Sequence, residues 1–260
     1  MSHPNILVSE SGGILVIEIS RRDKKNAITA DMYRAMSSAL AHAREQGHVR
    51  VVLLRGQEDM FTAGNDLADF LHRKAGDPSA AIPFLHLIAS FEKPIVAAVA
   101  GNAVGIGTTL LLHCDLVYAA DNARFQLPFV NLALCPEGAS SLLLPRVAGY
   151  QRAAELLLLG EPFDAATARE AGFVNRVLPA NELMAAAMET SKKLAARPAG
   201  SLAVTKALMK RPPERSAIES IDEEVIYFGD LVAAPAAKEI FAAFLEKRAP
   251  DPDKIHGDKK

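Results

Sequence analysis

The sequence predicts an α/β fold, and two observations support it. Val51–Leu54 and Ile95–Val99 are short, continuous runs of apolar and β-branched residues, which is typical of strands in a sheet buried on both faces. Segments with helical spacing of their apolar residues alternate with these runs. This alternation favours one mixed core over separate all-α and all-β parts.

Most of the expected strands lie in the N-terminal half. Ile6–Val8 and Ile14–Ile19 are expected to pair around Gly12-Gly13. Asp31 is expected to cap a helix that runs to about Gln46 and stops at Gly47. The elements expected next are strands at Val51–Leu54, Ile95–Val99 and Cys114–Ala119, and helices at Leu67–Lys74 and Ala80–Phe91.

Helices dominate after Gly138. They are expected at Gln151–Leu159, Glu182–Ala196, Leu202–Lys210, Ala217–Tyr227 and Ala236–Lys247, with a short strand at Phe173–Val177 as the only clear break. We therefore expect a core over residues 1–198 and a C-terminal helical region over residues 199–260. The apolar stripes of the last two helices are expected to pack on the core or on another subunit.

Composition excludes several classes of protein. With 260 residues, 50% hydrophobic and 23% charged, the chain can bury a sizeable globular core. A formal charge of −2 gives no general attraction to nucleic acid or to anionic membranes, so neither is an expected partner. Cys114 and Cys135 lack a C-x-x-C spacing, and the histidines form no ligand pair, so no disulfide framework and no metal site is expected. Without a visible secretory signal, a reducing, cytoplasmic location is expected.

One uncharged stretch, residues 94–114, has to be weighed as a membrane span because Gly101 and Gly105 form a G-x-x-x-G pattern. Asn102 and Thr108 interrupt the stretch, and its first part is rich in β-branched residues. These features favour a strand that breaks at glycines before a short helix.

Two strand-loop-helix units carry the chemistry. The first runs through Arg50–Gly56 into the loop Phe61–Leu67, and the second through Pro94–Gly101 into Asn102–Gly107. Each loop can aim a free backbone N–H at one point, and two such donors make an oxyanion hole. Glu137 follows in an apolar neighbourhood, so a single carboxylate suggests proton relocation through an enolate. For either loop alone, the ordinary interpretation is a glycine turn that packs a sheet against helices.

Two other motifs are incomplete. Gly105-Ile106-Gly107 lacks the third glycine and the downstream acid of a dinucleotide-binding unit. Gly138-Ala139-Ser140-Ser141-Leu142 lacks the second glycine of a nucleophile elbow, so its serines are expected to be early helix residues.

At these loops the sequence resembles the crotonase, or enoyl-CoA hydratase/isomerase, superfamily. The segments that carry the resemblance are Lys25–Ala27, Phe61–Leu67, Lys93–Gly101, Cys114–Val117, Ala171–Val174 and Phe244–Arg248. The resemblance implies a spiral of ββα units with a CoA site in the core, and a C-terminal helical oligomerisation region that builds trimers or pairs of trimers.

The resemblance also implies site residues. The N–H groups of Asn65 and Ile106 are expected to bind the thioester carbonyl of an acyl-CoA. The residues expected to bind CoA are Lys24, Lys25, Ala27, Ala63, Asp66 and Lys247. The basic cluster within Arg21–Lys25 can meet the phosphates, and Lys247 can reach in from the C-terminal helix, even from a neighbouring subunit. Asp66 can equally cap the helix that follows. CoA is part of the substrate, so no separate cofactor is expected.

Departures from the family pattern narrow the reaction. Hydratases of the family hold water with two glutamates, and those positions align here with Thr109 and Phe129. Neither residue can act as a carboxylate base. The context Pro-Glu-Gly around Glu137 resembles the Δ3-Δ2-enoyl-CoA isomerases, especially the peroxisomal type, in which one glutamate at this position moves the proton.

Apolar neighbours are expected to raise the pKa of the Glu137 carboxyl toward the working pH by desolvating it. The neighbours expected are Phe129, Leu132, Leu134 and Leu142. The alternative is an exposed acid at a helix N-terminus, because Pro136-Glu137-Gly138 also resembles a helix start.

Our first hypothesis is therefore an acyl-CoA double-bond isomerase in fatty-acid degradation, in which Glu137 moves a proton from C2 of a 3-enoyl-CoA to C4. The alternatives are an enoyl-CoA hydratase or other crotonase-type lyase, and a non-catalytic acyl-CoA-binding protein that kept the fold.

Overall fold

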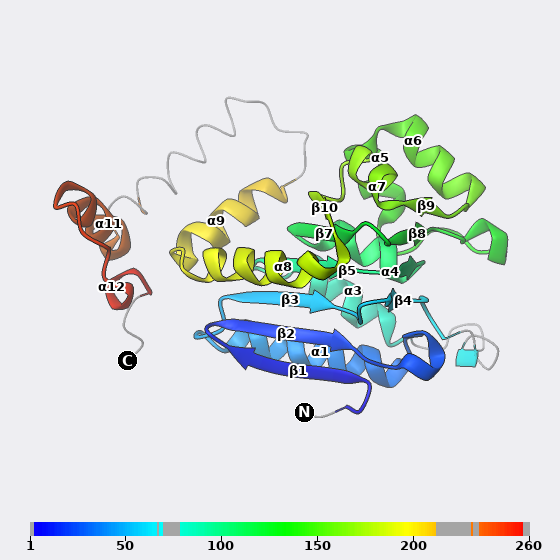
Figure 1. Cartoon of the computed structure of the whole chain (residues 1–260), viewed down its shortest axis with the longest axis horizontal. Helices are drawn as coiled ribbons and strands as arrows, with labels where there is room; N and C mark the ends of the chain where they lie inside the picture. Colours follow the sequence, from blue (N-terminus) through cyan, green and yellow to red (C-terminus); the bar gives the residue numbers. More distant parts are fainter. Residues whose placement is uncertain (1–2, 67, 70–78, 212–229, 231–233, 257–260) are drawn as a thin grey trace.

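The computed structural model describes residues 3–66, 68–69, 79–211, 230 and 234–256 (Figure 1). Its strands are β1 (Ile6–Ser11), β2 (Ile14–Ile19), β3 (Val51–Arg55), β4 (Met60–Thr62), β5 (Ile95–Val99), β6 (Asn102–Val104), β7 (Leu116–Ala120), β8 (Arg124–Gln126), β9 (Phe163–Asp164) and β10 (Arg176–Leu178). They form a larger sheet, in the order β1-β2-β3-β5-β7-β10, and a smaller one, in the order β4-β6-β8-β9.

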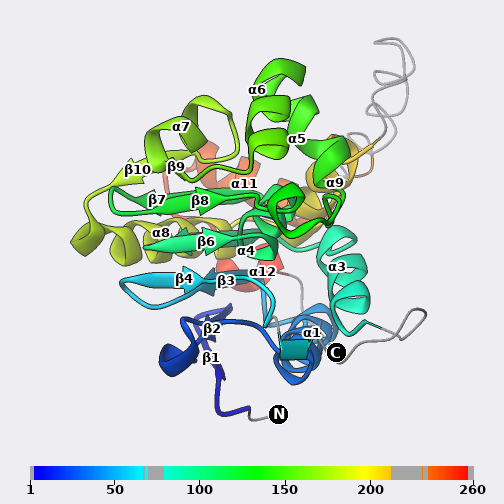
Figure 2. The ribbon, with the colours of Figure 1, turned by 90° about the vertical axis from the view of Figure 1, so that its right-hand side faces the viewer.

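The chain winds as a spiral. In each of three successive turns one strand joins the larger sheet and the next joins the smaller one: β3 and β4, then β5 and β6, then β7 and β8. Neighbouring strands from β2 to β10 in the larger sheet are parallel, as are β4, β6 and β8 in the smaller one. Figure 2 shows the turns stacked on one another. The predicted spiral of ββα units is confirmed.

The helices are η1 (Arg22–Lys24), α1 (Ala30–Glu45), α3 (Ala81–Ala89), α4 (Ile106–Thr109), η2 (Leu110–His113), η3 (Val130–Leu132), α5 (Ser140–Ala148), α6 (Tyr150–Ala154), η4 (Glu155–Leu159), α7 (Ala165–Glu170), α8 (Ala180–Ala195), α9 (Ala199–Met209), α11 (Pro235–Leu245) and α12 (Pro252–His256). The prediction that Asp31 caps the first of the long helices is wrong. Thr29 is the N-cap, because its extended backbone lets its hydroxyl accept a hydrogen bond from the Met32 N–H.

The core explains why the strands are continuously apolar. Val52 and Leu54 of β3 face the main core, which they share with α1 and α3. Val51 and Leu53 point to the opposite face and pack with α8. Since successive side chains of a strand alternate between faces, burial of both faces requires an apolar residue at every position.

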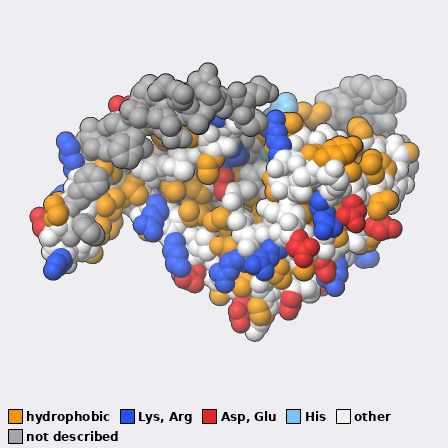
Figure 3. All heavy atoms as spheres, turned by 90° about the horizontal axis from the view of Figure 1, so that it is seen from above, with side chains coloured by type: hydrophobic (Ala, Val, Ile, Leu, Met, Phe, Trp, Pro, Cys, Tyr) orange, Lys and Arg blue, Asp and Glu red, His pale blue; other side chains and the backbone are white. Residues whose placement is uncertain are grey.

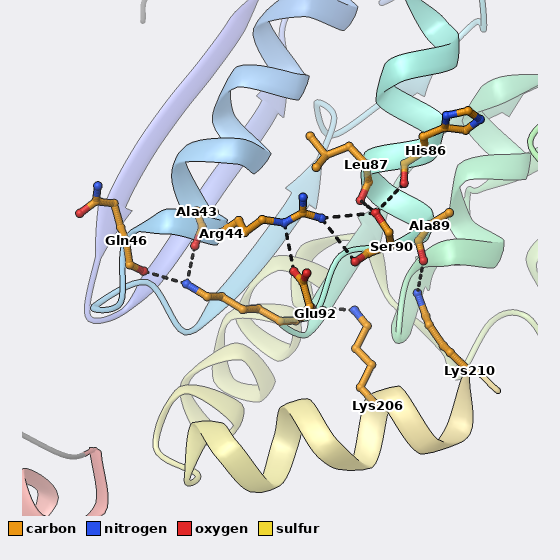
Figure 4. Close-up of polar contacts among 11 residues, drawn as sticks. Ala43, Arg44, Gln46, His86, Leu87, Ala89, Ser90, Glu92, Lys206 and Lys210 are labelled. Carbon is orange, nitrogen blue, oxygen red and sulfur yellow. Dashed lines mark hydrogen bonds and ion pairs between the residues drawn. The ribbon is translucent and has the colours of Figure 1, made fainter. Parts of the chain in front are cut away.

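Buried lysine contacts attach α9 to the core (Figure 4). Lys206 is only 4% exposed, and its ammonium donates to the Lys93 carbonyl at 2.7 Å and to Asp115 Oδ2 at 2.6 Å. The same Asp115 oxygen accepts the Ile95 N–H at 2.7 Å. Helix α9 is thereby fixed at the starts of β5 and β7, whereas the division at residue 198 stays a prediction.

Most of the long predicted elements are confirmed, within a few residues at their ends. The strand expected at Phe173–Val177 is misplaced: β10 begins at Arg176, and the Phe173 ring packs edge-on against Phe125 in the core. The helices expected at Leu67–Lys74 and Ala217–Tyr227 fall wholly or largely outside the described residues. In the described part of the chain no helix is long and apolar enough to span a membrane, and residues 94–114 form strands and short helical turns.

Candidate active site

Two glycine-bearing loops meet at one end of the smaller sheet. They follow β4 and β6, which are parallel neighbours, so both loops leave from the same end of the sheet. A Cβ added to Gly107 would lie 2.4 Å from Thr62 Cγ2, and one added to Gly64 would lie 2.8 Å from the Val104 carbonyl oxygen. The loops therefore touch at positions where only glycine fits.

Asn26 and Thr62 hold the first loop in shape. Asn26 is fully buried, and its amide nitrogen lies 3.0–3.1 Å from the carbonyl oxygens of Ile19, Met60 and Phe61. The Thr62 hydroxyl donates to the Asn26 carbonyl at 2.7 Å and accepts the Gly64 N–H at 3.0 Å. These contacts determine where the backbone of the next residue, Asn65, is placed.

The residues adjacent to the two expected oxyanion-hole donors have backbone N–H groups that already make hydrogen bonds. The Asp66 N–H donates to the Ile28 carbonyl, and the Gly105 N–H donates to the Gln126 carbonyl. The Asn65 and Ile106 N–H groups make no hydrogen bond within the described residues. Ile106 is the first residue of α4, where an N–H has no partner inside its own helix. Both N–H groups are therefore free to bind a ligand, and their joint role as an oxyanion hole stays a prediction.

Glu137 lies one helical turn from the Ile106 amide. Thr109, the last residue of α4, is fully buried, and its hydroxyl donates to Glu137 Oε1 at 2.5 Å. Burial raises the pKa of the Glu137 carboxyl above its ordinary value, and the weaker opposing effect is the hydrogen bond from Thr109. The site therefore combines unpaired amides with a carboxyl suited to act as a base.

The prediction of the apolar neighbours of Glu137 is partly wrong. Phe129 is buried, but Leu132, Leu134 and Leu142 are 48–50% exposed, because η3, the loop after it and the outer face of α5 point away from the core. Leu85 of α3 instead approaches from the other side, with Cδ2 3.4 Å from where a Cβ on Gly138 would lie. The alternative of an exposed N-terminal acid does not hold, since the carboxyl bonds Thr109 three residues before α5 begins.

Tyr33 supports the site through Asn65, and sequence reasoning missed it. This residue of α1 is 3% exposed, and its hydroxyl donates to Asn65 Oδ1 at 2.5 Å. Burial, with the charges of Glu137 and Asp69, raises the Tyr33 pKa well above its usual value, so the phenol stays neutral. The available signal was a tyrosine within an apolar stripe, because a buried hydroxyl needs a partner.

The residues expected to bind CoA lie beside the first loop, except for Lys247. The side chains of Lys24 and Lys25 are exposed, and the Ala63 N–H donates to the Lys25 carbonyl at 3.0 Å. Arg21 donates to the Ala27 carbonyl at 2.9 Å and to Asp66 Oδ2 at 2.7 Å. Asp66 also accepts the Ala68 N–H, as the capping alternative predicted.

Hydrogen bonds within the chain limit how the backbones of Ala63 and Asp66 can contact a ligand. Both N–H groups are already used within the chain, so of these backbone groups only the carbonyl oxygens can meet a ligand, and that of Asp66 already accepts the Asp69 N–H at 3.0 Å. Lys247 follows α11, which Figure 1 shows at the opposite end of the molecule from η1. A single chain therefore does not bring Lys247 to this site.

The face in Figure 3 carries acidic and basic side chains interspersed with hydrophobic ones. Some charged side chains of the described residues are paired: Arg152 lies 2.9 Å from Glu155, and Lys193 lies 2.6 Å from Glu189. A surface of this kind lacks the one-signed field that attracts a polyanion.

Comparison with known proteins gives a consistent family. The sequence profile described as enoyl-CoA hydratase/isomerase matches residues 9–254. Enoyl-CoA delta isomerase 2 of Rattus norvegicus is 36% identical over 226 residues, 84% of this chain and 57% of the rat protein. The 2,3-dehydroadipyl-CoA hydratase of Escherichia coli K12 is 30% identical over 248 residues, 95% of this chain and 97% of that one.

A solved structure from Magnetospirillum magneticum AMB-1, provisionally described as an enoyl-CoA hydratase/carnithine racemase, is 44% identical. It superposes with a TM-score of 0.93 over 96% of this chain and 99% of that chain. The relatives are thus named for different reactions, although one profile describes the family.

Proposed function

The chain belongs to the enoyl-CoA hydratase/isomerase family, and within that family we propose that it moves the double bond of a 3-enoyl-CoA to the 2-position. The observation that carries the proposal is the contact of Glu137 with Thr109. The position expected to hold a hydratase's partner carboxylate holds a hydroxyl, so one carboxyl has to serve as both base and acid.

The chemistry follows from the arrangement of these groups. Glu137 removes a proton from C2, the enolate oxygen accepts hydrogen bonds from the Asn65 and Ile106 amides, and the same carboxyl returns the proton at C4. A thioester α-proton is only weakly acidic, so the enolate needs stabilisation before the proton leaves. Each such donor contributes about 3 kcal/mol to the transition state.

Recognition of the CoA portion is assigned to the edge beside the first loop. Lys24 and Lys25 are exposed there and can meet phosphates. The carbonyls of Ala63 and Asp66 can accept the adenine amino group. Lys247 would have to come from another subunit, which the proposed trimer or hexamer can supply. If the protein has the mass of a single chain in solution and is fully active, Lys247 does not belong to the site.

A second candidate is an enoyl-CoA hydratase, favoured by the Escherichia coli relative that matches almost the whole chain. Purified protein should be incubated separately with 3-enoyl-CoA and 2-enoyl-CoA, and products followed by chromatography and mass. Isomerisation gives a new product of unchanged mass from the 3-enoyl substrate. Addition of water to 2-enoyl-CoA as the main reaction would overturn the proposal, and no change in either substrate would indicate a binding protein.

A further inference from the structure

The imidazole of His113 lies behind Glu137, outside the groups that contact substrate in the proposed reaction. His113 ends η2, is 7% exposed, and places Nε2 2.8 Å from the Gly138 carbonyl oxygen. A carbonyl oxygen only accepts hydrogen bonds, so Nε2 carries the hydrogen. The imidazole therefore donates to the peptide that immediately follows Glu137.

Thr109 and His113 are four residues apart on the continuous helical stretch formed by α4 and η2. Thr109 bonds the side chain of Glu137, and His113 bonds the backbone of the next residue, Gly138. Neighbouring turns of one element thus hold two consecutive residues of the loop.

This loop needs such support. Gly138 has φ +61° and Ala139 has φ +56°, so two consecutive residues are left-handed just before α5. For alanine this conformation costs about 1–2 kcal/mol and persists only where its surroundings impose it. The contact from His113 is formed at the first of these two residues.

We propose that His113 is a positioning residue: its hydrogen bond to the Gly138 carbonyl fixes the backbone that presents the Glu137 carboxyl to Thr109 and to substrate. The inference rests on the proposed function. It predicts that losing this bond slows proton transfer while leaving acyl-CoA binding intact.

The charged and titratable groups around His113 and Glu137 determine how the pH dependence of activity is interpreted. Burial lowers the pKa of His113, the Gly138 carbonyl opposes this, and Lys210, which follows α9, lowers the pKa further. Protonation of His113 leaves the Nε2 hydrogen in place, so its titration does not break the bond. Tyr33 of α1 stays neutral because its pKa is raised, in part by the charge of Glu137. A shift in the acidic limb of activity therefore reports on Glu137.

The test compares His113→Leu with His113→Gln, whose amide nitrogen can replace Nε2 as donor. The exposed His86 provides the control His86→Leu. We expect His113→Leu to lower kcat about 10- to 100-fold with little change in KM, because small misplacement of a catalytic group has costs of this size. Its acidic limb should move to lower pH, since a released carboxyl is better solvated, and His113→Gln should restore both values.

The inference would be overturned if His113→Leu kept the wild-type kcat and the wild-type acidic limb of the pH–activity profile. It would also be overturned if His113→Leu lowered kcat without moving this limb and His113→Gln did not restore kcat. Failure of the proposed function is distinguished by wild-type protein that does not isomerise 3-enoyl-CoA. In that case ¹³C NMR titration of the Glu137 carboxyl decides, with its signal assigned by loss in Glu137→Gln. A pKa that falls in His113→Leu and returns in His113→Gln supports the inference, and an unchanged pKa overturns it.

Discussion

The Thr109 hydroxyl donates to Glu137 Oε1 at 2.5 Å, one helical turn after the unpaired amide of Ile106. This contact bonds one carboxylate oxygen and leaves Oε2 for a proton in transit. It also joins the proposed base and one proposed oxyanion donor through a single turn of helix, so the two should keep their spacing when substrate binds.

Thr109→Val tests this contact. The hydrogen bond favours the charged carboxylate, so its loss should raise the Glu137 pKa further. Because the base must be ionised, the acidic limb of kcat/KM should move to higher pH. Activity should recover at alkaline pH. Thr109→Ser keeps the hydroxyl and should keep the wild-type limb, and an unmoved limb in Thr109→Val would contradict the role.

Tyr33→Phe should separate the first loop from α1. Loss of the hydroxyl leaves the Asn65 side chain without its 2.5 Å donor, so the backbone of that residue is less firmly placed. We expect kcat/KM to fall about tenfold while the free energy of unfolding changes by about 1 kcal/mol. Steady-state kinetics and denaturant unfolding measure the two effects. Unchanged kinetics would show that the Asn65 backbone is fixed without Tyr33.

Gly107→Ala should push the two loops apart. The added methyl group would meet Thr62 Cγ2 at 2.4 Å, and overpacking of this kind costs about 1–3 kcal/mol. Activity should fall by more than the loss of folded protein explains. Gly12→Ala is the control, because it has open space and a positive φ, so it strains a remote turn without touching the site. Equal kinetics in the two variants would contradict this account.

Lys206→Met should destabilise the attachment of α9. Asp115 would remain partly buried without its cation, and breaking a buried pair on one side costs about 3 kcal/mol or more. Thermal unfolding should show a clearly lower Tm. Lys192 is exposed on α8, so Lys192→Met should change stability by no more than about 0.5 kcal/mol. Similar Tm values for both variants would show that the pair is not stabilising.

The sequence predicts those parts of this molecule whose structure depends on residues that are neighbours along the chain. Val51–Leu54 and Ile95–Val99 are strands because every position is apolar, and the loops that follow are recognisable by their glycines. The strands β4, β6, β8 and β9 have two or three residues each, and their pairing partners determine them more than their own residues do. These short strands could not be predicted from their own residues.

The site divides in the same way. Glu137, Asn65 and Ile106 were expected from motifs that resemble a family. Tyr33 and His113 make their contacts 32 and 25 residues away along the chain, and nothing in their local pattern identifies those partners. The predicted apolar neighbours of Glu137 are partly wrong because residues close in sequence need not pack together, and Leu85 of α3 approaches the adjacent Gly138 instead.

The most direct test of the central claim is the initial rate at which wild-type protein and Glu137→Gln convert 3-enoyl-CoA to 2-enoyl-CoA, measured above the acidic limb, together with the affinity of each for acyl-CoA. Removal of a general acid-base group should lower kcat roughly a thousandfold while leaving affinity within a few fold. A Glu137→Gln rate within about tenfold of wild type would contradict the assignment of proton transfer to Glu137.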